Sequence, residues 1–88
     1  MEPSMFFGQA LEALKEGDKV ARVGWNGKGM FLFSIAGGCW DFTTDISGVD
    51  EIDTLQFFCM KTADNKLVPW LASQSDVLAD DWESGPAG

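Results

Sequence analysis

Large aromatic rings are unusually frequent in this chain of 88 residues, which holds seven Phe and four Trp but no Tyr. A domain of this size buries only about 60–70% of the surface that its unfolded chain exposes. One subunit can therefore hardly bury all of the rings, although a single core that contains them stays an alternative. Because Trp and Phe dominate the energetics of interfaces, we expect some rings to line a pocket or a subunit contact in a homo-oligomer.

The charge of the chain argues against DNA or RNA as a partner. Fourteen acidic and six basic residues give a formal net charge of −8, whereas nucleic-acid-binding proteins present a basic face. A small anionic ligand stays compatible with this total, because screening limits the reach of exposed charges to about 8–10 Å.

The sequence also indicates the compartment of the protein. No apolar run reaches the ~18 residues of a membrane span, and no signal peptide opens the chain. Cys39 and Cys59 are too few for a disulfide framework. We therefore expect a reduced, cytoplasmic protein that has no membrane partner.

An amphipathic helix is predicted near the start of the chain. Four apolar residues recur at the spacing of one buried helix face, namely Phe7, Ala10, Leu11 and Leu14. Gly17 should end this helix, because glycine readily adopts the left-handed conformation of helix C-termini. A short second helix is expected over residues 76–80. Ser73 or Ser75 can cap it, and Asp76 stands at capping-box spacing from the first of them.

Strands are predicted between the two helices from alternating or apolar residues. They cover residues 19–23, 30–35, 55–62 and 66–70. Asn26-Gly27 predicts a two-residue hairpin between the first two strands, since both positions tolerate positive φ. The acidic stretch 39–54 is expected to be a long loop. The predicted fold class is α+β: an N-terminal helix, a four-stranded antiparallel sheet and a short C-terminal helix.

One domain is expected, because no internal repeat or low-complexity segment divides the chain. This domain should span residues 6–83. Residues 1–5 are then an N-terminal extension, and residues 84–88 are a disordered tail.

No catalytic set is recognisable in the sequence. The chain has no His, so the commonest general base and the commonest metal ligand are missing. No nucleophile elbow or phosphate-binding glycine loop is present. Asp80 and Asp81 would point about 100° apart on a helix, which suits neither a shared proton nor a metal ion. We therefore expect no enzyme, no metal and no cofactor.

Three tryptophans are suited to binding a nucleotide. Trp25, Trp70 and Trp82 each stand at the end of a predicted element, where a side chain can be half buried and still face a ligand. Stacking of a base on an aromatic ring is worth about 1–3 kcal/mol. The candidate phosphate partners are Arg22, Lys28 and Lys61. A core ring at a strand end is an equally good interpretation of each Trp, so these residues alone indicate a small ligand-binding domain.

A series of short motifs, in a specific order and spacing, covers nearly the whole chain from Phe6 to Glu83. The motifs are FGQALEALK at 7–15, VAR at 20–22, GWNGKGM at 24–30, MKTAD at 60–64, VPWLASQSD at 68–76 and LADDW at 78–82. In these motifs the chain resembles the Thoeris anti-defence protein 2 family of phage and prophage proteins. The resemblance implies a phage-encoded protein that acts in the cytoplasm of the infected bacterial host.

The resemblance also implies a function. Members of this family act as sponges, which bind the cyclic nucleotide messengers of bacterial immune systems and hold them without cleavage. The implied ligands are glycocyclic ADP-ribose, the Thoeris messenger, and for some relatives the cyclic dinucleotides of the cyclic-oligonucleotide (CBASS) systems, in a separate pocket. A homotetramer with ligand pockets at subunit contacts is implied as well. Two alternatives stay open: an acidic interaction protein that inhibits a host enzyme, and, less favoured, a cyclic-nucleotide hydrolase.

Matching the motifs residue by residue predicts a ligand site. A base is expected on a Trp face, ribose hydroxyls on Asp or Asn, and phosphates on cations. The predicted site residues are Trp25, Asn26, Trp70, Ser73, Gln74, Ser75, Asp81 and Trp82, with the cations Arg22, Lys28 and Lys61. The chain departs from the family pattern at Phe6, where relatives have a polar helix cap. Gln56-Phe57 replaces Pro-Tyr, and Asn65 replaces a turn glycine. These departures bear on ligand choice more than on the fold.

Overall fold

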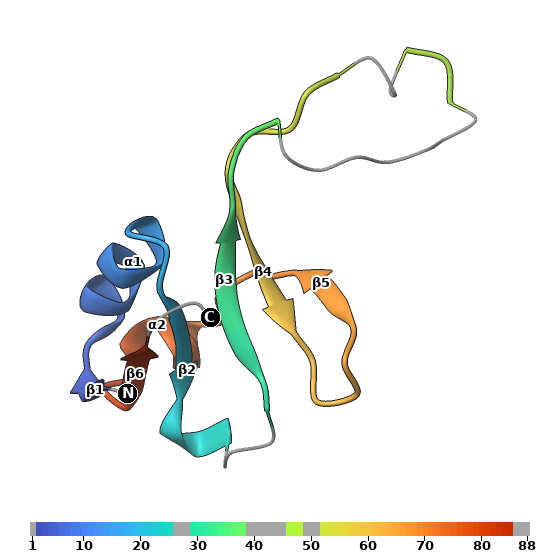
Figure 1. Ribbon diagram of the computed structural model, residues 1–88. Helices are drawn as coiled ribbons and strands as arrows, with labels where there is room; N and C mark the ends of the chain where they lie inside the picture. The colour runs from blue at the N-terminus through green and yellow to red at the C-terminus, as the bar shows by residue number, and fades with distance from the viewer. Residues whose placement is uncertain (1, 26–28, 39–45, 49–51, 86–88) are drawn as a thin grey trace.

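An antiparallel sheet with two helices forms the protein (Figure 1). The computed structural model describes residues 2–25, 29–38, 46–48 and 52–85. Within these residues the strands are β1 (Glu2–Met5), β2 (Lys19–Arg22), β3 (Phe31–Ile35), β4 (Phe57–Lys61), β5 (Leu67–Pro69) and β6 (Trp82–Gly85). The helices are α1 (Phe7–Lys15) and α2 (Gln74–Leu78). The predicted α+β class, with an N-terminal helix and a short C-terminal helix, is confirmed.

The sheet has six strands over the described residues, in the order β1-β6-β2-β3-β4-β5, and not the four that the sequence predicted. The missed strands are β1, in the predicted extension, and β6, which includes Ser84 and Gly85 of the predicted tail. β6 pairs with β2, where Val20 lies opposite Ser84, and β1 pairs with β6. The sequences of these strands, EPSM and WESG, show no regular alternation of apolar and polar residues. Both strands form because they pair with distant parts of the chain, which sequence propensity does not reveal.

The connection between β2 and β3 is longer than the predicted two-residue hairpin. β2 ends at Arg22 and β3 begins at Phe31, and a 3-10 turn, Val23–Trp25, opens the connection. The backbone N–H of Val23 donates to the Asp81 carbonyl at 2.9 Å. After Arg22 the chain therefore turns toward the segment before β6 and no longer pairs with β3. Asn26-Gly27 itself lies outside the described residues, as does most of the 39–54 stretch.

Helix α1 follows the prediction at both ends. Ala10 and Leu14 of the predicted stripe are fully buried. Phe6 is the N-cap and offers no side-chain acceptor, but its backbone N–H donates to Gln9 Oε1 at 2.9 Å. After the helix, Gly17 has a φ of 96°, the left-handed conformation in which glycine terminates helices.

The core lies between α1 and one face of the sheet. Its fully buried side chains include Leu14 of α1, Val20 of β2, Leu32 of β3 and Trp82 of β6. Three other rings surround the Trp82 indole, with centroids 5.6 Å away for Phe7, 5.7 Å for Trp25 and 6.0 Å for Trp70. Four large rings therefore pack as one group at the end of the core next to α2.

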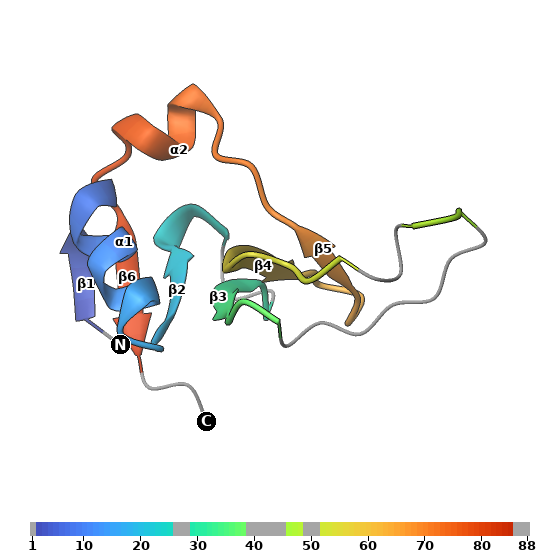
Figure 2. The same cartoon turned by 90° about the horizontal axis from the view of Figure 1, so that it is seen from above.

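The opposite face of the sheet points away from α1, because side chains alternate between the faces of each strand. Figure 1 and Figure 2 both show α1 beside β6 and β2, with β4 and β5 at the opposite edge of the sheet. We call the face that points away from α1 the outer face. It carries mostly apolar side chains at positions that the strand register pairs: Lys19, Ala21, Phe31, Phe33, Ile35, Phe57, Cys59, Lys61, Leu67, Pro69 and Glu83.

No helix in the described parts of the chain is both long enough and apolar enough to cross a membrane.

Candidate functional site

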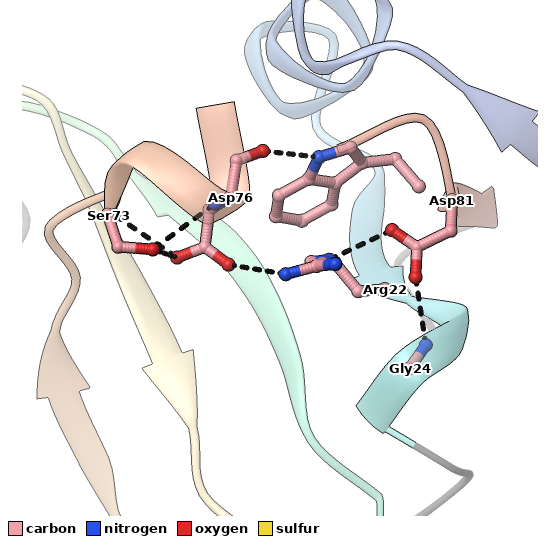
Figure 3. A network of polar contacts seen from close by, with 6 residues as sticks. Arg22, Gly24, Ser73, Asp76 and Asp81 are labelled. Atoms are coloured by element: carbon pink, nitrogen blue, oxygen red, sulfur yellow. Dashed lines mark hydrogen bonds and ion pairs between the residues drawn. The ribbon is translucent and has the colours of Figure 1, made fainter. Parts of the chain in front are cut away.

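The side chain of Arg22 joins β2 to two later segments of the chain. Its Nε donates to Asp81 Oδ1 at 2.9 Å, and a terminal nitrogen donates to Asp76 Oδ1 at 3.0 Å. Figure 3 shows the guanidinium between the two carboxylates. Asp76 lies in α2 and Asp81 directly precedes β6, so one cation fixes α2 and the start of β6 against the sheet.

Further hydrogen bonds extend this arrangement, which we call the Arg22 network: Arg22, Gly24, Ser73, Asp76 and Asp81 (Figure 3). Asp81 Oδ2 accepts from the Gly24 backbone N–H at 3.0 Å. Asp76 Oδ2 accepts from both the backbone N–H and the hydroxyl of Ser73. The Asp76 N–H donates back to the Ser73 hydroxyl. This reciprocal pair is the predicted capping box, and Ser73 is the N-cap of α2.

The network shifts the ionisation of all three charged groups. Hydrogen bonding from Arg22 is the main reason why the pKa of Asp81 is lowered. Burial works to raise the pKa of Asp76, but the hydrogen bonds from Ser73 and Arg22 outweigh it, and that pKa is lowered too. The hydrogen bond to Asp81 raises the pKa of Arg22. All three groups are therefore fully charged at neutral pH, and the two carboxylates are poor candidates for general acids.

Two tryptophans stand beside this network with part of each ring accessible. Trp25 and Trp70 are half-buried and meet the Trp82 ring edge-on, at interplanar angles of 78° and 84°. Trp82 itself is fully buried, and its Nε1 donates to the Asp76 carbonyl at 3.0 Å. Trp82 therefore supports the other two rings from within the core.

A hollow of about 400 Å³ opens on the outer face below the 3-10 turn. This volume falls within the range of small-molecule pockets. Ala21 of β2 lies between Phe31 on β3 and Glu83 on β6, because Ala21 pairs with Glu83 and Val20 pairs with Leu32. The remaining lining residues are Lys19, Arg22, Val23, Trp25, Gly29 and Met30. A small side chain at Ala21, flanked by larger ones, accounts for the depression.

Two ammonium groups flank one ring at this hollow. Lys19 Nζ lies 5.0 Å from the centroid of Phe31, and Lys61 Nζ lies 5.7 Å from it. Lys61 also donates to the Gly29 carbonyl at 2.9 Å. Cations at these distances are attracted to the face of an aromatic ring. The outer face of a strongly acidic chain thus carries a local concentration of positive charge.

A second hollow, of about 420 Å³, lies at the C-terminal end of α1. Its lining combines polar side chains with Leu14, Ala36 and two glycines, and Gln56 donates to Ser34 Oγ at 2.8 Å. It contains none of the predicted site residues and no aromatic ring.

Two comparisons with known proteins identify the family of this chain. Residues 5–84 match the Thoeris anti-defense 2-like domain. The protein named Thoeris anti-defense 2 from Bacillus phage SP01 is 44% identical over 86 residues, which cover 94% of this chain and 97% of that protein. The chain belongs to the Thoeris anti-defense 2-like family. The resemblance that the sequence motifs indicated is therefore confirmed, and with it membership of a phage anti-defence family.

In this member of the Thoeris anti-defense 2-like family, six of the predicted site residues meet around the Arg22 network and its tryptophans: Arg22, Trp25, Trp70, Ser73, Asp81 and Trp82. Lys61 lies apart from them, beside Phe31 on the outer face. Gln74 and Ser75 are exposed on α2. Asn26 and Lys28 lie outside the described residues.

Sequence reasoning missed two chemical groups of the hollow, the Lys19 ammonium and the Phe31 ring. The alternation along β2 and β3 contains a usable signal, because it places Lys19 with Ala21 and Phe31 with Phe33 on the same side of the predicted strands. What the alternation could not provide was the order of the strands, which brings Glu83 of β6 to the other side of Ala21.

Proposed function

We propose that this chain binds a cyclic nucleotide immune messenger and sequesters it without cleavage, which protects a phage from the Thoeris defence. The observation that carries the proposal is the hollow beneath the 3-10 turn, where aromatic rings of Trp25 and Phe31 and the ammonium of Lys19 line one space. Rings that can stack on a base and a cation that can pair with a phosphate are the chemistry of nucleotide binding.

The name of the phage SP01 relative supports the anti-defence part of the proposal. Glycocyclic ADP-ribose is the ligand that we propose first, because it is the messenger of the defence for which the family is named. Cyclic dinucleotides of CBASS systems are the second ligand class to be tested.

Sequestration, in place of hydrolysis, is supported by the chemistry of the available groups. The chain has no His, and the carboxylates of Asp76 and Asp81 are both bound to Arg22. No group of metal-ligating side chains occurs within the described residues. A group that is already ionised and paired has little tendency to take up or release a proton at neutral pH.

We further propose a homotetramer in which the outer face contacts a second copy. An antiparallel sheet face that remains in water normally carries polar residues, whereas this face presents half-buried Phe33 and Ile35 and a Leu67 that is 51% exposed. Because the hollow opens on the same face, a neighbouring copy would lie close to a bound ligand.

The sequestration proposal is tested by a recovery experiment. Protein is mixed with a substoichiometric amount of glycocyclic ADP-ribose, the free ligand is measured by filtration and mass spectrometry, and the complex is then heat-denatured. We expect free ligand to disappear and intact ligand to return after denaturation. Recovery of an opened product indicates a hydrolase. No depletion of any cyclic nucleotide, together with stoichiometric capture of one host protein from lysate, indicates the acidic interaction protein.

The oligomer proposal is tested by light scattering after size-exclusion chromatography. We expect a mass of four chains of 9.6 kDa each and a smaller particle for Phe33→Glu, which places a charge on the outer face. The matched control is Leu71→Glu, because Leu71 is 91% exposed and lies outside that face. Wild-type protein that elutes as a monomer at all concentrations would contradict the proposal.

A further inference from the structure

Two cations, Lys19 and Lys66, have no acceptor for the side-chain ammonium among the described residues, and of the two only Lys19 lines the hollow. Lys15 pairs with Glu12 on the exposed surface of α1 at 3.8 Å. Arg22 is bound to two carboxylates, and Lys61 donates to the carbonyls of Gly29 and Thr62. For Lys19, the structure records a contact with the Phe31 ring and, among the described residues, no hydrogen-bond acceptor. Its three N–H donors are therefore open to a ligand.

The surroundings of Lys19 favour an anion on the ligand. The ammonium lies at the rim of the hollow, over the Phe31 ring, and the Lys61 ammonium is 5.7 Å from the centroid of the same ring. Half-buried groups on this rim are less hydrated than groups in open water, which strengthens a charge-assisted hydrogen bond. Arg22 lines the same hollow, but its Nε and one terminal nitrogen donate to Asp81 and Asp76, so two carboxylates already offset its positive charge.

Glu83 makes the two sides of the hollow chemically different, because it places a carboxylate opposite the side that carries Lys19 and Phe31. It stands across Ala21 from Phe31, so a second anionic group on that side would be repelled, whereas a hydroxyl or amino group could donate to its carboxylate. The arrangement thus suits a molecule that has a phosphate at one end, a flat ring over Ala21, and hydrogen-bond donors at the other end.

From this geometry we infer that Lys19, and not Arg22, binds the phosphate of a nucleotide held in the hollow, with the ligand's ring between Phe31 and Trp25 and its donors at Glu83. This inference rests on the proposed function and deepens it. Arg22 is then a structural residue that holds the 3-10 turn through Asp81 and Gly24.

The experiment compares wild type, Lys19→Gln and Lys19→Arg by calorimetric titration with glycocyclic ADP-ribose at several salt concentrations. Lys19→Gln should weaken binding at least about tenfold, as expected for loss of a charge-assisted hydrogen bond, and it should reduce the dependence of affinity on salt. Lys19→Arg, which keeps the charge, should stay within about threefold of wild type. The matched control is Lys15→Gln, which removes the same charge from the α1 surface and should bind as wild type does.

A parallel NMR titration with ADP keeps the two proposals separable. The amide signals of Ala21 and Phe31 should move with ADP in wild type and stay in place in Lys19→Gln. If wild type binds no cyclic nucleotide but shows this Lys19-dependent response, the proposed function fails and the phosphate site stands. If cyclic nucleotide binds equally to wild type and Lys19→Gln, or if neither ligand binds, the inference is wrong.

Discussion

Arg22 donates a 2.9 Å hydrogen bond to Asp81, a residue 59 positions later in the chain. This contact joins β2 to the residue that precedes β6, and Asp81 in turn accepts from the Gly24 backbone at the start of the 3-10 turn. The turn that carries Trp25 and the segment that carries Trp82 are thereby held together. The Arg22 network consequently links the stability of the fold to the position of the accessible Trp25.

Replacing Arg22 by Gln should therefore destabilise the protein. The carboxylates of Asp76 and Asp81 are 15% and 30% exposed, and both would lose their cation. We expect the free energy of unfolding to fall by about 2–3 kcal/mol, the usual scale for hydrogen bonds between charged groups. Urea unfolding monitored by Trp fluorescence, at one fixed protein concentration, measures the change.

The exposed ion pair on α1 provides the control for the Arg22 substitution. Lys15 and Glu12 are 3.8 Å apart with side chains 59% and 72% exposed, so Lys15→Gln should change the free energy of unfolding by less than about 0.5 kcal/mol. Equal effects of the two substitutions would show that the Arg22 network contributes no more than a surface pair.

The stability of the protein should depend on pH in the acidic range. The pKa values of Asp76 and Asp81 are lowered from 3.8 in the folded state. A lowered pKa contributes stability that is fully present above the unfolded value and is lost as the pH falls through the folded value. We expect the free energy of unfolding to decline below about pH 4 and the Asp81→Asn variant to decline less steeply. Parallel pH profiles for wild type and this variant would contradict the assignment.

Periodicity within a single element was enough to predict α1. Ala10 and Leu14 repeat at helical spacing, and both side chains are fully buried. The Ser73–Asp76 capping box was equally readable, because all of its groups lie within four consecutive residues. Both features could be predicted because the residues that form each of them are close together in the sequence.

Contacts between distant segments could not be predicted in the same way. The motifs marked Arg22 as a phosphate partner, because a free guanidinium suits that role, and nothing near it in sequence reveals its partners in α2 and before β6. Trp82 was expected at the ligand site, but it occupies the centre of the core. Both outcomes follow from the pairing of β6 with β2, a strand that carries no periodic signal of its own.

The two serines that were candidates for capping α2 should respond differently to substitution. Ser73 accepts from the Asp76 N–H and donates to its carboxylate, whereas Ser75 is exposed within the helix. Ser73→Ala should therefore cost about 1 kcal/mol of unfolding free energy, and Ser75→Ala should cost less than about 0.5 kcal/mol. Amide hydrogen exchange would show where in α2 the stability is lost. We expect the amides of Asp76 and Val77 to exchange faster in the Ser73 variant alone.

The accessible tryptophans should affect ligand binding more than assembly. Trp25→Ala and Trp70→Ala each remove a half-buried ring beside the buried Trp82. Because stacking on a ring is worth about 1–3 kcal/mol per base, Trp25→Ala, which removes a ring that lines the hollow, should bind glycocyclic ADP-ribose about 5- to 150-fold more weakly. Trp70→Ala removes a ring that packs against Trp82 without lining the hollow, so it should weaken binding less. Both variants should elute from size-exclusion chromatography as wild type does. Phe6→Ala is the matched control, since this ring is 67% exposed at the N-cap of α1 and does not line the hollow. Normal binding by both tryptophan variants would exclude these rings from the site, and a changed elution volume would assign them to the subunit contact.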